Sequence, residues 1–427
     1  MTAEVAIYNR SAITLAADSA VSISRGQAPH KIYNNAEKLF AITKHHPVGL
    51  MIYGSSDLLG IPWELIIKQH RLKLGTDSFP SLREYACSFF EFVEDFFKKL
   101  PYESYKTEYS DYLDFIVDDT FQKVTEYAGL EDYEEVEPKV IKSFSDAIRD
   151  LKEVLGQNSD FYCQLSEADL QGAKADLQDF AVAIFNDFFN LEEKADQEPC
   201  KSFIELCAVR VTKIDVFYDN TTGLVFAGYG DDEYLPQMYN FDVYGLYDGK
   251  LKYHDKNPKG ISSSTTAGLQ AFAQREEVDT FMQGVSKPVK KNFNESVKHM
   301  YKASVQVIDE LIANECSEEH REVLKEKYSN IVDKKFHSVV KDAQDFVVDN
   351  YINKVVDMIK HLPKNEMAYM AESLVNLTAF KRKVSNDSDS VGGPIDVAVI
   401  SKGDGFVWVK RKHYFDSTLN HHYRTPK

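Results

Sequence analysis

The sequence predicts an α+β protein in which pairs of antiparallel strands are separated by long helical segments. Short apolar runs of strand type occur near the start, in the middle and near the end of the chain, and turn residues follow most of them. The residues between these runs carry apolar side chains every three or four positions, which is the spacing of amphipathic helices. Hairpin turns between neighbouring strands favour antiparallel pairing.

The composition is that of an acidic globular chain. Of its 427 residues, 43% are hydrophobic, and the formal net charge is −17. This charge argues against nucleic acid and anionic membranes as partners. No apolar run reaches the roughly 18–20 residues of a membrane span, and residues 1–4 lack the charged and apolar regions of a secretory signal. We therefore expect a cytoplasmic protein.

The five cysteines are scattered along the chain, and no two of them have CxxC spacing. They are Cys87, Cys163, Cys200, Cys207 and Cys316. This pattern predicts reduced thiols in the core, and it favours neither a zinc site nor a disulfide framework. The chemistry inferred below needs no metal and no cofactor.

Residues 2–18 predict a β-hairpin whose first strand begins at the N-terminus. Val5 and Ile7 fall on one face of the first strand, residues 9–11 have turn chemistry, and a second small-apolar run follows at 12–17. In a tight antiparallel hairpin the end of the second strand lies beside the start of the first. Asp18 is therefore expected near Thr2.

Thr2 has the chemistry of an N-terminal nucleophile. Methionine aminopeptidase removes Met1 before small residues, so Thr2 is expected to become the mature N-terminus. The residue would then carry a hydroxyl nucleophile and, in its own α-amine, the base that activates it. An unperturbed α-amine has a pKa of about 7.7–8.0, so it can accept a proton near neutral pH.

Lys38 is the third candidate of this site. A lysine within a few ångströms favours the neutral amine and the charged alkoxide, and Asp18 can hold that lysine in place. In this arrangement Thr2 is both nucleophile and base, the charge of Lys38 acts on the amine and hydroxyl of Thr2, and Asp18 orients Lys38. A solvated strand lysine is the alternative for Lys38.

Four segments of the chain resemble proteasome β subunits and their bacterial relatives, which are N-terminal-nucleophile (Ntn) hydrolases of the threonine type. They are Thr2, residues 15–19, residues 38–40 and residues 48–54. The resemblance implies a four-layer αββα sandwich with helices outside two antiparallel sheets. It also implies that Thr2, Asp18 and Lys38 form the active site, and that Gly54 matches the glycine of the oxyanion hole.

The resemblance covers about half of the chain and divides it. Residues 1–75, 201–285 and 366–427 are expected to form the Ntn core, and two helical insertions are expected at 76–200 and 286–365. Within the first part, strands are expected at 3–8, 12–18, 37–43 and 47–53, and a helix at 58–73. The acidic helices of the first insertion are a solvated surface or, alternatively, a docking face for a basic partner.

The second part of the expected core starts with four strand signals, at 203–211, 212–218, 222–228 and 236–244. The Ser/Thr run at 262–268 is expected to open a helix at Leu269. In the family a serine before this helix lies near the nucleophile. Ser263, or Ser264, is the candidate here, although such a run is also an ordinary helix cap.

The C-terminal part predicts paired strands at 395–401 and 406–411. The family places an Asp and a Ser just before a Gly-Gly pair that leads into such a strand. In this chain Val391 stands at the Ser position, and Ser388 at the Asp position. Ser390, one position away, is the candidate assisting serine; an altered site or an ordinary turn is the alternative.

These observations predict a cytoplasmic threonine peptidase that hydrolyses peptide bonds with Thr2. A peptide or protein substrate, a homo-oligomer and an ATP-dependent unfoldase partner are what the resemblance implies. Two alternatives stay open. One is a catalytically silent proteasome-like scaffold, which the departures at the two serine motifs favour. The other is a small-molecule amide hydrolase that uses the same nucleophile.

Overall fold

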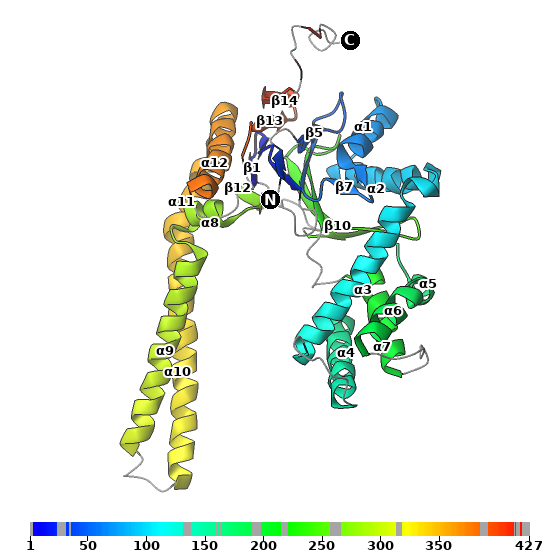
Figure 1. Ribbon diagram of the computed structural model, residues 1–427. Coiled ribbons are helices and arrows are strands. Elements are labelled where there is room, and N and C mark those ends of the chain that lie inside the picture. The colour runs from blue at the N-terminus through cyan, green and yellow to red at the C-terminus, as the bar shows by residue number, and fades with distance from the viewer. Residues whose placement is uncertain are drawn as a thin grey trace. The chain divides into compact units, whose positions relative to one another are not determined.

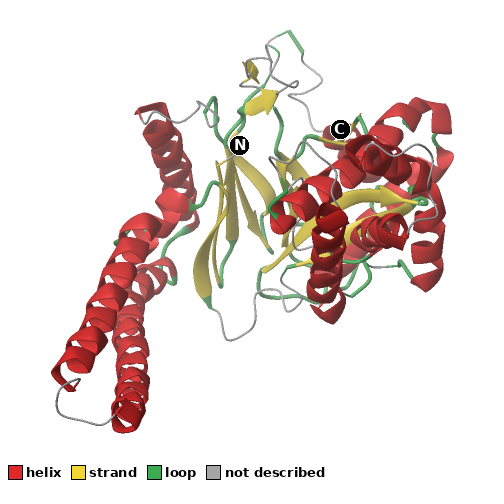
Figure 2. Cartoon of the chain, turned by 60° about the horizontal axis from the view of Figure 1, so that its bottom comes forward, coloured by secondary structure: helices red, strands yellow, loops and turns green. Residues whose placement is uncertain are grey.

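The computed structural model describes residues 3–23, 31–33, 36–130, 138–158, 160–162, 164–189, 198–214, 221–256, 266–312, 318–384, 392–413, 415 and 419–420. The chain forms two compact units. Unit 1 contains residues 1–36, 262–402 and 407–427, and unit 2 contains residues 37–261 and 403–406. Each unit has its own antiparallel sheet (Figures 1 and 2).

The sheet of unit 1 has five strands in the order β12-β1-β2-β13-β14. The N-terminal strand β1 therefore lies between its hairpin partner β2 and β12, which is distant in sequence. Val5 pairs with Ala16 on one side and with Ala271 on the other. The strands of this sheet are β1 (Ala3–Asn9), β2 (Ile13–Ala17), β12 (Ala267–Ala273), β13 (Asp396–Ser401) and β14 (Gly405–Lys410).

One face of this sheet packs against helices, because alternate strand residues are small and apolar. Val5 and Ile7 of β1 share a core with Ala371 and Val375 of α12. Small side chains such as Ala16 let helices approach the sheet closely. The helices of this layer are α8 (Glu276–Gln283), α11 (Asn353–Ile359) and α12 (Lys364–Val384).

Two long helices of unit 1 form an antiparallel hairpin (Figure 1). They are α9 (Lys287–Ile312) and α10 (Glu318–Val347), and a π-helical turn, Val348–Ile352, continues α10 into α11. The bidentate contact of Arg321 with Asp309, at 2.8 and 3.0 Å, joins the two helices near the tip. Tyr301 and Phe336 meet further down, with ring centroids 6.1 Å apart.

The sheet of unit 2 has the strand order β11-β10-β9-β6-β5. Its core contains Leu50 and Phe226, together with Trp63 of α1 and Phe89 and Phe90 of α2. The elements of this layer pair are β5 (Leu39–Ala41), β6 (Val48–Gly54), β9 (Thr222–Gly228), β10 (Gln237–Tyr247), β11 (Lys250–Asp255), α1 (Trp63–Leu74) and α2 (Leu82–Lys99). Two small hairpins complete the described strands. In unit 1, β3 (Val21–Ile23) pairs with β4 (Lys31–Tyr33), and in unit 2, β7 (Asp57–Leu58) pairs with β8 (Ile61–Pro62).

A second core in unit 2 is almost entirely helical. It is built on aromatic side chains such as Phe144, Phe185 and Phe203, all fully buried. The helices that contribute are α3 (Lys106–Ala128), α4 (Pro138–Asn158), α5 (Glu167–Asp176), α6 (Gln178–Phe189) and α7 (Glu198–Thr212), and a short 3-10 turn, Tyr102–Ser104, precedes α3.

The predicted strand at 203–211 is wrong, because these residues lie in helix α7. Phe203, Cys207 and Val211 are all buried and recur every four positions, which is helical spacing. The phenylalanine, isoleucine and valines within 203–211 favour a strand by local propensity alone. Of the next predicted strand, 212–218, the part from 215 on lies outside the described residues.

Two further predictions need correction. The helix expected from Leu269 is instead strand β12, which pairs along β1, and helix α8 begins only at Glu276. The helix expected from Leu58 begins at Trp63, because residues 57–62 form the hairpin of β7 and β8. In both cases the local turn and cap residues resemble a helix start.

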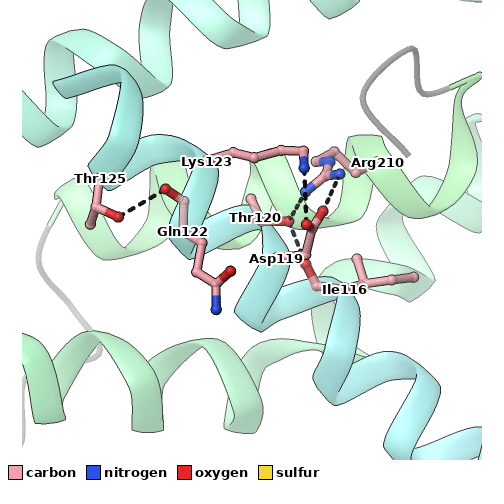
Figure 3. Close-up of polar contacts among 7 residues, drawn as sticks. All are labelled: Ile116, Asp119, Thr120, Gln122, Lys123, Thr125 and Arg210. Atoms are coloured by element: carbon pink, nitrogen blue, oxygen red, sulfur yellow. Dashed lines mark hydrogen bonds and ion pairs between the residues drawn. The ribbon is translucent and has the colours of Figure 1, made fainter. Parts of the chain in front are cut away.

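Helix α7 is fixed to α3 by a partly buried ion pair (Figure 3). Arg210 donates to Asp119 at 2.7 Å and to the hydroxyl of Thr120 at 2.8 Å. Lys123 also contacts Asp119, at 2.9 Å. Burial raises the pKa of Asp119, but the hydrogen bonds from Arg210 and Lys123 outweigh it and hold the pKa below its ordinary value.

The mixed α+β class with antiparallel sheets is confirmed. The stacking of four layers as αββα stays a prediction. None of the described helices combines the length and the apolar character that crossing a bilayer requires.

Candidate functional site

The β1–β2 hairpin of unit 1 is closed by a turn that is itself anchored. Asn9 Oδ1 accepts from the backbone N–H of Ser11 at 2.9 Å and from its hydroxyl at 2.6 Å. Asn9 Nδ2 donates to the carbonyl oxygens of Ile359 and Leu362, at 3.0 and 2.9 Å. One asparagine thus joins the first turn to the end of α11, which fixes the position of β1.

Asp18 lies fully buried at the end of β2, where the prediction placed it beside the start of β1. Its Oδ1 accepts from the backbone N–H of Ala3 at 3.1 Å, and its own N–H donates to Ala3 O at 3.1 Å. Its Oδ2 accepts from Gly392 N at 3.0 Å and from Ala20 N at 3.4 Å. Backbone N–H donors therefore reach both oxygens of this buried carboxylate.

The glycine pair of the C-terminal part lies at this carboxylate. Besides the bond from Gly392 to Asp18, the N–H of Ser19 donates to Gly392 O at 3.1 Å, and the Ser19 hydroxyl donates to Pro394 O. The structure therefore brings the Gly-Gly segment to Asp18. Ser19 and Gly392 were not predicted as site residues, although the position of Ser19 directly after Asp18 was a usable signal.

Three of the predicted site residues lie outside the described residues. They are Thr2, Ser263 and Ser390. Their roles stay predictions.

Lys38 belongs to unit 2 and directly precedes β5. Its backbone carbonyl accepts from Ile52 N at 2.9 Å, which extends the pairing of β5 with β6 by one residue. The residue is only 4% exposed, so the alternative of a solvated strand lysine is wrong. A buried lysine is uncommon and is kept for ion pairing or for chemistry.

Gly54, also in unit 2, ends β6 with φ +86°. A Cβ at this position would lie 2.0 Å from Thr221 O, so only glycine fits between β6 and the start of β9. Beside it, Trp63 Nε1 donates to Thr222 Oγ1 at 3.0 Å. The glycine therefore has a steric reason to be there, whatever its part in catalysis.

A cavity of about 340 Å³ opens next to this glycine, within unit 2. Ser55 and Thr222 line it on the Gly54 side, and Tyr112 and Phe115 of α3 line it from the helical side. Three carboxylates also line it: Asp57, Glu108 and Asp111. The lining is therefore mixed aromatic and acidic.

The predicted site residues are divided between the two units. Thr2 and Asp18 are in unit 1, with Ser263 and Ser390, whereas Lys38 and Gly54 are in unit 2. Within unit 1 the structure joins Asp18 to Ala3 and to the Gly-Gly segment. The catalytic trio as a whole stays a prediction.

Comparison with known proteins gives little. No protein-family model matches the chain, and neither does any curated protein. Among solved structures, the chain is similar to an Anbu (Gly-1) mutant from Hyphomicrobium sp. strain MC1. The TM-score is 0.31 and the identity 11%, over 100% of this chain and 98% of the other.

The identification of the chain as a member of the proteasome β-subunit-like family is therefore wrong. It rested on four short segments near the N-terminus, and no family model recognises the chain that contains them. A structural match with a TM-score of 0.31 does not replace such a model.

Proposed function

We propose that this protein hydrolyses amide bonds, with peptide bonds as the first class to test, and that Thr2 is the nucleophile. The observation that carries the proposal is the bond between the Asp18 carboxylate and Ala3 N–H, at 3.1 Å in a fully buried setting. Thr2 is covalently joined to Ala3, and neighbouring Cα atoms are about 3.8 Å apart. The buried carboxylate thus binds the residue next to the proposed nucleophile, which supports the assignment.

In the proposed reaction, Met1 is first removed, which frees the α-amine of Thr2. Thr2 Oγ attacks the carbonyl carbon while the amine takes the hydroxyl proton, and the amine then gives this proton to the departing nitrogen. An ester between Thr2 and the acyl group remains. Water, deprotonated by the same amine, hydrolyses that ester and restores the hydroxyl.

The other predicted residues are assigned supporting roles. Lys38 lowers the pKa of the Thr2 amine and hydroxyl by its charge, Asp18 orients the site, and the N–H of Gly54 donates to the oxyanion. Ser263 and Ser390 assist proton transfer. The burial of Lys38 supports its assignment, because an amine with little access to water exerts a stronger field on its neighbours.

The experiment follows the nucleophile and the free amine together. Intact mass should show a chain that begins at Thr2. An epoxyketone, whose adduct needs both the hydroxyl and the amine, should label wild type and Thr2→Ser but not Thr2→Ala. Hydrolysis of a peptide and amide panel should follow the same order. Active protein that retains Met1, or a Thr2→Ala variant with wild-type turnover, contradicts the mechanism.

Lys38→Met separates charge from packing, because methionine keeps most of the buried aliphatic volume. We expect turnover below a tenth of wild type, with the thermal midpoint close to that of wild type. Lys99→Met, at an exposed lysine of α2 in unit 2, is the matched control and should keep its activity. If no panel member is cleaved by wild type and no probe attaches, the chain is a silent scaffold.

A further inference from the structure

The α9–α10 hairpin exposes an apolar stripe on each helix, and both follow a regular pattern. On α9 the exposed apolar side chains each expose 54% to 64% of their surface: Val289, Phe293, Met300, Val307 and Leu311. On α10 the main stripe has 38% to 59% exposure: Leu324, Ile331, Val339 and Phe346. Val323 is exposed beside Leu324.

Both stripes lie on one side of the hairpin. Tyr301 and Phe336 meet in the seam between the helices. Tyr301 follows Met300, the centre of the α9 stripe, and Phe336 follows Lys335, the centre of the α10 stripe. One residue turns an α-helix by about 100°, so both stripe centres are rotated away from the seam by the same angle and in the same sense. In a pair of antiparallel helices, side chains that are rotated from the seam by equal angles in the same sense lie on the same side of the pair. We call this side, formed by the two stripes, the apolar face.

The spacing of each stripe is symmetric about its centre. In α9, Val289 and Leu311 are equally far from Met300, and so are Phe293 and Val307. In α10, Leu324 and Phe346 flank Lys335 at equal distances, as do Ile331 and Val339. The Tyr301–Phe336 contact puts Met300 and Lys335 at the same height along the hairpin. A single two-fold axis at this height therefore exchanges the stripe positions above it with those below it on both helices.

The hairpin lacks an interior of its own. No residue of α9 is buried, although the helix has 26 residues, and Val332 is the only buried apolar residue of α10 among the described residues. Long helices in water take most of their stability from the packing of an apolar face. The hairpin exposes the face that would normally supply it.

Charge fixes the direction of the partner. The described residues at the tip of the hairpin, 303–312 and 318–331, hold six acidic and three basic residues, whereas residues 287–302 at the base hold five lysines and one glutamate. Residues 332–347, also at the base, hold three of each sign. Tip and base thus carry −3 and +4, so a second hairpin is attracted in the antiparallel direction and repelled in the parallel one.

We propose that the apolar face is the contact surface of a symmetric dimer, in which the hairpins of two copies pack antiparallel as a four-helix bundle. Met300 lies at the two-fold axis, and Phe293 of each copy meets Val307 of the other. Helices of this length span about 40 Å, and two of them side by side present a face of about 800 Å². This is the area per partner of an ordinary stable complex.

The assembly is tested on the full chain by light scattering after size exclusion. Met300→Lys places two charges at the axis, so the measured mass should be half that of wild type. Gln306→Lys adds the same charge to an exposed position on another side of α9 and should leave the mass unchanged. Circular dichroism should show equal helix content in all three. Lys335→Leu removes the like charges at the axis and should lower the dissociation constant about tenfold.

Cysteine pairs test the direction. Under mild oxidation Met300→Cys should form a linked dimer, and a mixture of Phe293→Cys with Val307→Cys should link one copy of each. Phe293→Cys alone, Gln306→Cys and wild type should stay unlinked. A monomeric wild type, whether or not it binds anionic vesicles through this face, or an unchanged mass for Met300→Lys, overturns the proposal. Linking of Phe293→Cys to itself overturns the antiparallel arrangement.

Discussion

The backbone N–H of Gly392 donates to Asp18 Oδ2 at 3.0 Å, across 374 positions of the chain. Together with the bond from Ala3 to Oδ1, it makes Asp18 the point at which the first strand, the second strand and the segment before β13 are joined. This carboxylate has a structural role, and the proposed mechanism gives it a catalytic one. Substitution of Asp18 separates the two roles.

Asp18→Asn should lower the free energy of unfolding by about 1–3 kcal/mol, because an amide nitrogen facing a buried N–H leaves donors unsatisfied. Urea unfolding checks the magnitude. Asp232→Asn, at an exposed aspartate of unit 2, is the control and should change stability by less than about 0.5 kcal/mol. Equal effects of the two substitutions would show that the Asp18 bonds contribute nothing. At temperatures below the melting temperature of Asp18→Asn, where the variant is folded, its turnover reports the catalytic role of the carboxylate.

Gly54→Ala should destabilise the protein by more than about 3 kcal/mol, because the positive φ costs about 1–3 kcal/mol and the methyl group also collides with Thr221 O. Gly75→Ala is the matched control. Its φ is also positive, at +56°, but no atom lies within 4 Å of the added methyl. The difference between the two melting temperatures measures the collision alone, and a Gly54→Ala protein as stable as Gly75→Ala would contradict the geometry.

His70 should make the protein sensitive to mild acid. It is buried between Phe89 and Phe92, and neither ring nitrogen has a hydrogen-bond partner among the described residues. Burial, helped by the charge of Lys73, lowers the pKa of His70 from 6.5 to about 4. The unfolded chain therefore binds a proton below pH 6.5 that the folded chain does not bind until about pH 4.

The stability contributed by neutral His70 is complete above its unfolded pKa and is lost as the pH falls from 6.5 toward 4. We expect a loss of about 2 kcal/mol between pH 7.5 and pH 5. His70→Phe removes this titration and should flatten the profile in urea unfolding. His361→Phe, at an exposed histidine, should keep the wild-type profile. Parallel profiles for wild type and His70→Phe would refute the assignment.

Asp119→Asn should destabilise unit 2 because it leaves the Arg210 guanidinium, 3% exposed, with a weaker partner. Removing one member of a buried pair costs about 3–5 kcal/mol. We expect the lower end, because the Asp119 side chain is 21% exposed. Asp146→Asn removes the exposed contact with Arg149 and should cost less than about 0.5 kcal/mol. Similar melting temperatures for the two variants would show that the Asp119–Arg210 pair contributes no more to stability than an exposed ion pair.

The elements with strong local signals could be predicted from the sequence. Strands β1 and β2 follow from alternation around the Asn9 turn, and Asp18 follows from the length of that hairpin. The same local rules failed at β12, because the strand character of Ala267–Ala273 comes from its pairing with β1 and not from its own composition. They failed at α7 because a mostly buried helix and a buried strand are both rich in apolar residues.

The candidate site could be predicted only in part, for the same reason. Asp18 was found because its partner Ala3 is close in sequence. Its other partner, Gly392, was not, because nothing near residue 18 indicates a donor from the C-terminal part. The burial of Lys38 likewise depends on tertiary contacts and not on the residues beside it.

The position of β1 between β2 and β12 has a consequence for synthesis on the ribosome. β2 follows β1 at once, but β12 leaves the ribosome about 260 residues later, which at about 5–20 residues per second takes roughly 13–50 s. For that time one side of β1 has no neighbouring strand, and the first residues of the chain are open to processing enzymes. The proposed removal of Met1 would have this interval available, and a faster translation rate would shorten it.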